Sequence, residues 1–238
     1  MTFDQAGARA RCEWGPQGLR ALAPADVVIV VDVLSFSTCA EIAAGRGAEI
    51  LPFPWKDGRG SAFAAAEGAV LARPRGSGRY SLSPASFLDA PFGLRCVLPS
   101  PNGAALALAA RDLRSVVLAG SLRNAAAVAD AARRLGTSWN VCPAGERWPD
   151  GSLRPALEDW IAAGAILRGL PGPRSPEAEA AVVSFEASRT RLPETLAATG
   201  SGRELIARGF PGDVDLAAAL DAGGHVPRLA GTAFVAAA

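Results

Sequence analysis

A carboxylate at the end of an apolar run is the first feature of this chain that could do chemistry. Residues 27–31 are all β-branched, which is typical of a strand buried on both faces, and Asp32 follows directly. In an open α/β sheet, ligands bind at the carboxyl ends of the strands. Thr38 and Glu41 match the capping box of a helix start, so a cation and a phosphate could bind here. The alternative is that Asp32 only caps a turn.

Two further strand ends carry small polar side chains. Residues 94–98 and 115–119 are predicted strands, and the polar residues that follow them are Ser100, Asn102, Ser121 and Asn124. By default, such residues are helix N-caps. As a group at the ends of successive strands, they could also donate hydrogen bonds to phosphate oxygens.

A pair of acids, Glu158 and Asp159, lies early in a helix expected from Pro155 to Arg168. The helix dipole alone favours acids at such positions. Because adjacent residues lie about 100° apart around a helix, one carboxylate could face a cleft while the other caps the helix or meets solvent. A structural role and a functional role are therefore both open.

Composition narrows the classes of partner. The 238 residues carry a net charge of +1 without a basic block, which argues against nucleic acid as the main partner. No apolar run approaches the ~18–20 residues of a membrane span, and residues 1–5 lack a signal-peptide pattern. We therefore expect a cytoplasmic protein that binds a small molecule and no membrane. The assembly to consider is a homodimer.

The scarcity of histidine limits the metal chemistry. His225 is the only histidine, so a site of several histidines cannot form within one chain. Carboxylates, carbonyls and water remain as ligands, and these favour Mg²⁺ over Zn²⁺. Cys142 precedes Arg147, but this spacing is one residue short of the pattern of cysteine-dependent phosphatases, and no histidine lies nearby to activate the thiol. We interpret Cys142 as a buried structural residue.

The order of the elements predicts an α/β fold. Further strands are expected at 8–14, at an edge of the sheet, and at 48–53 and 139–142. Helices are expected at 38–45, 61–72, 103–110, 125–135, 155–168, 175–189 and 201–209, with a short one from 213 and an extended tail at 225–229. This alternation favours a three-layer α/β/α architecture with a mixed sheet. We expect one domain over residues 1–238, with two similar lobes at 1–113 and 114–238 as the alternative.

Several short motifs of one known family recur here in order. They are Asp32-Val33-Leu34, Asn102-Gly103, Gly120-Ser121, Asn124-Ala125, Cys142 to Gly145, Glu158-Asp159, Ala163-Gly164, and Gly202-Arg203-Glu204-Leu205 through Gly209 to Asp213. From about Val27 to Leu229, the chain resembles the 2-phosphosulfolactate phosphatase family. The resemblance implies a magnesium-dependent phosphatase that hydrolyses 2-phospho-3-sulfolactate to sulfolactate and phosphate in coenzyme M synthesis. It also implies an α/β fold distinct from the Rossmann and haloacid-dehalogenase folds.

On this interpretation the chain is a metal-assisted phosphomonoesterase for a small anionic phospho-acid. The resemblance carries over Asp32, Glu158 and Asp159 as Mg²⁺ ligands, with Asp32 and Glu158 as the catalytic acids. The residues expected to hold the phosphate are Ser100, Asn102, Gly103, Ser121 and Asn124. The attack would come from a water activated by the metal or, alternatively, from Asp32 through an aspartyl-phosphate. The competing class is a non-catalytic member that binds a small anion, and an acid-lined cleft would favour the enzyme.

Three segments depart from the family pattern. Ser35 stands where the family typically has arginine, a Gly-Glu-Arg segment is reduced to 75–79, and the Asn-Gly loop reads Ser-Pro-Asn-Gly-Ala at 100–104. A missing basic group leaves a substrate anion less well compensated, and charge-assisted contacts contribute about 1.5–3 kcal/mol each. We therefore expect 2-phosphosulfolactate to be a poor substrate, unless Arg79 or Arg123 supplies the charge from another direction.

Overall fold

The described residues form one large mixed sheet and a separate two-stranded sheet of β8 (Glu146–Arg147) and β9 (Leu153–Arg154). The computed structural model describes residues 3–55 and 57–237, so residues 1 and 2 of the N-terminal stretch considered above lie outside it. Within the described residues the large sheet has nine strands, in the order β1-β7-β2-β6-β10-β11-β3-β5-β4. They are β1 (Ala10–Cys12), β2 (Val27–Val31), β3 (Glu49–Phe53), β4 (Val70–Leu71), β5 (Arg95–Pro99), β6 (Val116–Gly120), β7 (Trp139–Pro143), β10 (Pro227–Ala230) and β11 (Ala233–Ala236).

Two parallel halves of the sheet meet at an antiparallel hairpin. β1, β7, β2 and β6 run parallel to one another, and so do β3, β5 and β4. Between the two halves, β10 pairs antiparallel with β6 and β11 pairs antiparallel with β3. The mixed sheet and the edge position of β1 are confirmed. The extended tail predicted at 225–229 is instead part of this central hairpin, where Phe234 is buried with its ring edge-on to Phe36.

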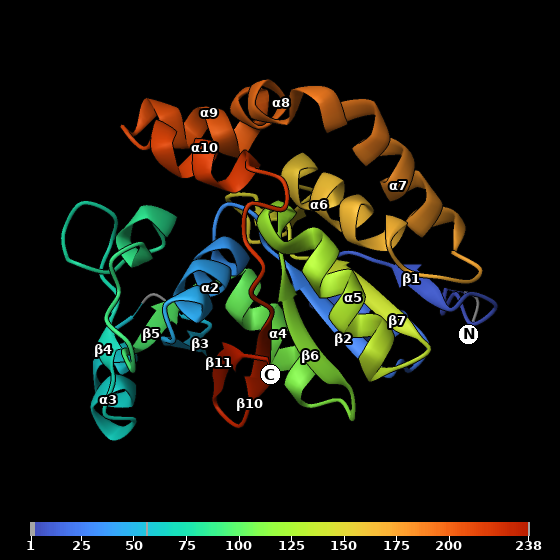
Figure 1. The fold of residues 1–238 in the computed structure, drawn as a ribbon. Coiled ribbons are helices and arrows are strands. Elements are labelled where there is room, and N and C mark those ends of the chain that lie inside the picture. The colour runs from blue at the N-terminus through green and yellow to red at the C-terminus, as the bar shows by residue number, and fades with distance from the viewer. Residues whose placement is uncertain (1–2, 56, 238) are drawn as a thin grey trace.

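Helices cover both faces of the sheet, which confirms the three-layer α/β/α prediction (Figure 1). In β2 the side chains of Val27, Ile29 and Val31 face one core, and Val28 and Val30 face another. The first core is closed by α5 (Ala125–Leu135), α6 (Leu157–Arg168), α7 (Pro176–Ser188), α8 (Leu192–Ala198), α9 (Gly200–Ala207) and α10 (Pro211–Ala218). The second core is closed by α1 (Gly15–Ala21), α2 (Phe36–Gly45) and α4 (Gly103–Arg111). α3 (Arg59–Ala66) packs at the β3–β5 end.

The strands from the two halves of the sequence alternate in the sheet. β1 and β2 precede residue 113 and β7 and β6 follow it, yet the order is β1-β7-β2-β6. None of the helices in the described ranges is long and apolar enough to cross a membrane.

Three predicted element boundaries were wrong. α2 begins at Phe36, so Thr38 is not its N-cap; the Thr38 hydroxyl donates to the Val33 carbonyl oxygen at 2.7 Å instead. The helix predicted at 61–72 ends at Ala66, and residues 70–71 add β4 to the sheet edge. α9 is capped by Thr199, whose hydroxyl accepts the Gly202 N–H at 3.1 Å.

The twist of the sheet brings together strand ends that its topology would separate. β5 lies five steps from β2 in the strand order, and the three antiparallel pairings between them give it the opposite nominal direction. A twist of about 20–25° per step accumulates to roughly 100–125° over this distance. The carboxyl ends of β2 and β5 therefore approach each other, and the Asp32 carboxylate contacts the Gly103 amide at 2.8 Å.

Helices α6 and α7 pack closely enough to require a glycine. A Cβ at Gly164 of α6 would overlap the carbonyl oxygen of Ala181 in α7. Gly164→Ala is therefore expected to lower the free energy of unfolding by about 1–3 kcal/mol, despite the better helix propensity of alanine. The matched control is Gly212→Ala in α10, where a Cβ meets nothing within 4 Å and a gain of about 0.5–1 kcal/mol is expected. Urea denaturation of both variants measures this, and equal effects would contradict the packing argument.

Candidate active site

Asp32 is a buried carboxylate that joins two helix starts. Its side chain lies at the end of β2, where one oxygen accepts the N–H of Phe36 at 3.1 Å. The other oxygen accepts the N–H of Gly103 at 2.8 Å and the hydroxyl of Ser100 at 3.3 Å. A Cβ at Gly103 would lie 2.5 Å from this oxygen, so only glycine allows the approach. The α2 and α4 N-termini thus both point to one buried charge.

Asp159 makes an equivalent link on the other side of β2. It is buried in the first turn of α6, and its two oxygens accept the N–H groups of Val33 at 2.7 Å and Gly145 at 2.9 Å. These amides follow β2 and β7 respectively. The role that the structure gives to Asp159 is therefore to hold two strand ends together. The neighbouring Glu158 is also buried.

Glu146 is an acid of this site that the sequence analysis did not identify. It lies in β8 (Glu146–Arg147), three residues beyond the end of β7, and is partly buried. Its carboxylate accepts a hydrogen bond of 2.8 Å from the Asn102 side-chain amide. The available signal was positional, because Glu146 follows a buried strand much as Asp32 does.

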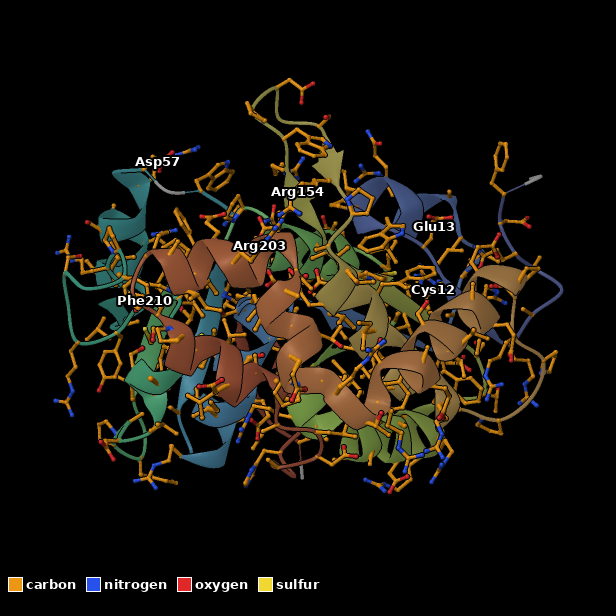
Figure 2. The ribbon with its side chains drawn as sticks, turned by 90° about the horizontal axis from the view of Figure 1, so that it is seen from above. Cys12, Glu13, Asp57, Arg154, Arg203 and Phe210 are labelled. Carbon is orange, nitrogen blue, oxygen red and sulfur yellow. The ribbon has the colours of Figure 1, made fainter. Side chains whose placement is uncertain are left out.

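One cavity of about 120 Å³ brings these groups together. Residues of α9 form part of its wall, and Figure 2 shows α9, where Arg203 is labelled, between the labelled Asp57 and Arg154, the second of which lies in β9 (Leu153–Arg154). Asp32, Ser100 and Asn102 line the cavity, as do Glu146 and residues from α9 and the loop after β4. The full lining is Asp32, Leu34, Ser35, Arg75, Leu82, Ser100, Pro101, Asn102, Glu146, Ser201, Glu204, Leu205 and Arg208.

Three acids in and behind this cavity, Asp32, Glu146 and Asp159, have raised pKa values. Burial is the main cause in each case. It raises the pKa of Asp32 against the opposing amide hydrogen bonds, and it raises the pKa of Asp159 well above its ordinary value with help from the charges of Asp32 and Glu158. Burial and the same two charges raise the pKa of Glu146 to about 7, although Arg154 and Asn102 act in the opposite direction. The site therefore holds a group that can exchange a proton near neutral pH.

Arg75 supplies a cation beside Ser35. Its guanidinium donates to the Ser35 hydroxyl at 2.8 Å and to the Leu82 carbonyl oxygen, and it forms an ion pair with buried Asp213 at 3.1 Å. The Ser83 hydroxyl also donates to Asp213. Arg75, in the loop after β4, thus supplies the positive charge that was expected to be missing near position 35.

Neither arginine named as an alternative source of this charge lies at the cavity. Arg123 pairs with buried Glu41 at 2.8 Å, and Arg79 lies over the ring of Tyr80. Both are absent from the residues that line the cavity within the described part of the chain. The arginines that do line it are Arg75, which lies beside Ser35, and Arg208, which pairs with Glu204 at 3.1 Å.

Ser121 and Asn124, which were expected beside the phosphate, are placed elsewhere. Both are fully buried, and the Asn124 side-chain oxygen accepts the N–H and hydroxyl of Ser121 at 2.8 and 3.1 Å. The Asn124 amide donates to the carbonyl oxygens of Ala119 and His225 at 3.3 and 2.9 Å. This pair caps the start of the α5 segment and holds the chain that leads to β10. The structure brings neither residue to the cavity, nor Glu158.

Cys142 lies inside the sheet, away from any reacting group. It is fully buried in β7, and burial raises the pKa of its thiol. A neutral, enclosed thiol is a poor nucleophile. This agrees with the interpretation of Cys142 as structural.

Comparison with known proteins shows the family to which this chain belongs. The fold and the site are those of an α/β protein with a small acid-lined cavity beside a partly buried arginine. A model of the family described as 2-phosphosulpholactate phosphatase matches residues 16–232, and the chain belongs to that family. The chain is 28% identical over 205 residues to the 2-phosphosulfolactate phosphatase of Methanothermobacter thermautotrophicus, covering 84% of each protein. It is 33% identical over 204 residues to a probable 2-phosphosulfolactate phosphatase of Carboxydothermus hydrogenoformans, covering 82% of each.

The raised pKa of Glu146 predicts a pH-dependent stability. Because the folded pKa of about 7 exceeds the ordinary value of 4.5, the folded protein holds this proton more tightly than the unfolded chain does. The contribution is fully present below pH 4.5 and is lost as pH rises through 7. Glu146→Gln should therefore gain stability relative to wild type between pH 5 and pH 8, measured by urea denaturation. Exposed Glu194→Gln in α8 is the control, and an equal pH dependence in wild type and Glu146→Gln would contradict the prediction.

Proposed function

We propose that this protein is a phosphatase that hydrolyses a small anionic phosphomonoester, such as 2-phospho-3-sulfolactate, to the hydroxy acid and phosphate. The observation that carries the proposal is the cavity itself, in which Asp32, Glu146 and Arg75 meet in a chain of this family. The proposal includes a place in coenzyme M synthesis, a cytoplasmic location and a homodimer.

The donor set of the cavity fits Mg²⁺ held by one carboxylate, with water and substrate as its other ligands. Within the described residues, no three acidic, histidine or cysteine side chains converge as metal ligands. Mg²⁺ is commonly held by one or two carboxylates, with waters and substrate phosphate completing its shell. Asp32 would hold it, since it lines the cavity, whereas Glu158 and Asp159 do not; Glu146, which also lines the cavity, is left free to carry a proton. When bound, Mg²⁺ would neutralise phosphate charge and activate water.

The residues of the chain can then be given roles in hydrolysis. Arg75 offsets the charge of the substrate anion, and Asn102 orients Glu146 through their hydrogen bond. A water oxygen bonds to phosphorus as the bond between phosphorus and the ester oxygen breaks. Glu146, protonated in part at neutral pH, delivers a proton to that ester oxygen, and the proton released by the attacking water returns to the Glu146 carboxylate. Glu146 is thus proposed as the catalytic acid in place of Glu158, which the resemblance to the family had suggested.

Attack by Asp32 itself has less support from the geometry. Each of its oxygens already accepts a backbone N–H, which fixes the carboxylate but directs its lone pairs to protein donors. The competing hypothesis of a non-catalytic anion-binding protein predicts a cleft closed by apolar side chains. The acidic lining of this cavity supports the enzyme instead.

A phosphate-release assay tests the proposal. Wild-type protein should hydrolyse at least one of phosphosulfolactate, phospholactate and phosphoglycolate with Mg²⁺ and lose this activity in excess EDTA. Glu146→Gln should lower kcat by about 10²–10⁴-fold, because the leaving oxygen then receives no proton from the protein. Glu194→Gln serves as the control for both.

Three results would count against the proposal. If folded protein hydrolysed none of the three esters, the proposed phosphatase function would be wrong. Full activity in excess EDTA would contradict the proposed requirement for Mg²⁺. Loss of activity in Cys142→Ser, with the fold intact by circular dichroism, would point to a thiol nucleophile.

Arg75 should determine how well the substrate anion binds. Arg75→Gln is expected to lower kcat/KM roughly ten- to a hundredfold, chiefly through KM, and Arg75→Lys should recover part of the loss. Ser35→Arg should bring no gain, because it would place a second guanidinium against Arg75. Ser83→Ala, which removes another bond to Asp213 but no cation, is the control. An equal loss in Ser83→Ala and Arg75→Gln would show that Asp213 positioning, rather than charge, matters.

A further inference from the structure

A second and larger cavity adjoins the proposed active site. It has a volume of about 350 Å³, against about 120 Å³ for the first. The two cavities share Arg75, Leu82 and Arg208 in their walls. Small-molecule sites commonly occupy about 300–1,000 Å³. The acid-lined cavity alone is smaller than this range, and the neighbouring cavity brings the pair into it.

The wall of the second cavity has an aliphatic part and a cationic part. The aliphatic side chains include Leu71, Leu82 and Pro99, and the cations are Arg73, Arg75 and Arg208. One acid, Asp57, also lines it, but its carboxylate pairs with Arg59 at 2.5 Å. The cavity therefore suits an organic group that is apolar along its length and negatively charged at its end.

Arg73 is the cation best placed to receive that charge. Arg75 already pairs with Asp213 at 3.1 Å, and Arg208 pairs with Glu204 at 3.1 Å. The exposed Arg73 guanidinium makes no hydrogen bond or ion pair with any residue in the described ranges. A ligand carboxylate or sulfonate there would form a charge-assisted contact that the protein itself does not provide.

We propose that the substrate extends from the acid-lined cavity into this second one, so that the preferred phosphomonoesters are those of hydroxy acids with a longer chain and a terminal anion. This inference rests on the proposed function and adds the class of organic group. The phosphate lies beside Asp32 and Glu146, the chain passes Leu82, and the terminal anion binds Arg73.

A homologous series of esters tests the chain length. The probes are phosphoglycolate and the 2-phosphate esters of malate, 2-hydroxyglutarate and 2-hydroxyadipate, each assayed with Mg²⁺ for kcat/KM. Wild-type protein should favour the longest ester over phosphoglycolate by roughly ten- to a hundredfold, as expected for one added charge-assisted contact.

Two pairs of variants locate the effect. Arg73→Gln should lower the ratio of kcat/KM for the longest and shortest esters by a similar factor, and Arg79→Gln, on the same loop but outside both cavities, should not. Ser61→Trp should lower the ratio by filling the cavity, whereas Ala62→Trp, next to it on α3 but outside the lining, should not.

A binding measurement separates this inference from the proposed function. If no ester is hydrolysed, the phosphatase proposal fails. A rise in Tm with the hydroxyadipate ester that exceeds the rise with phosphoglycolate, and is lost in Arg73→Gln, would still support the extended site. Equal kcat/KM and equal Tm shifts for all four esters would overturn it, as would indistinguishable behaviour of Arg73→Gln and Arg79→Gln.

Discussion

Two buried carboxylates that accept backbone N–H groups hold this end of the molecule together. Asp32 links the starts of α2 and α4, and Asp159 links the segments that follow β2 and β7. A buried carboxylate is costly without hydrogen-bond donors, and an amide at a helix start is unpaired without an acceptor. Each group therefore satisfies the other. The cavity lies where these links converge, and so its shape depends on them.

The hairpin between the two halves of the sheet explains why those links are long-range. With β10 and β11 inserted, β2 and β5 are separated by four strands, and yet Asp32 reaches the segment that follows β5. Only a strongly twisted sheet permits this contact. The C-terminal residues thus shape the active site without lining it, and the bond from Asn124 to the His225 carbonyl oxygen helps to fix where the hairpin begins.

The parts of this structure that a sequence can predict are those that local patterns determine. The apolar run of β2 and the alternation of elements led correctly to a mixed α/β sheet, and the structure brings Asp32, Ser100 and Asn102 to one cavity. The same pattern also suggested Ser121 and Asn124 beside the phosphate, but the structure places both outside the cavity. A polar residue at a strand end can cap a helix as readily as it can bind a ligand. The central hairpin was also missed, since β10 and β11 are short and their partners are distant in the chain.

Glu146 was not predicted, and the segment of Arg75 was open to an anion clamp or a solvated loop with the loop preferred, because the place of each residue depends on tertiary contacts. Glu146 is an ordinary turn acid by sequence, and its pKa reaches about 7 only because burial and the charges of Asp32 and Glu158 act on it. Arg75 lies in a glycine-rich segment that reads as a solvated loop. It enters the site because Asp213, far along the chain, fixes its guanidinium.

The balance of charge at the cavity favours a ligand that is anionic and a cation that accompanies it. Asp32 and Glu146 face the cavity, the charges of Asp32 and Glu158 raise the pKa values of Glu146 and Asp159, and Arg75 is already paired with Asp213. Burial outweighs the amide hydrogen bonds at Asp32, because the net shift of its pKa is upward. The acids therefore destabilise one another in the protein alone. A divalent cation would relieve that repulsion, and once bound it would attract phosphate, so the same electrostatic strain that costs stability favours the proposed chemistry.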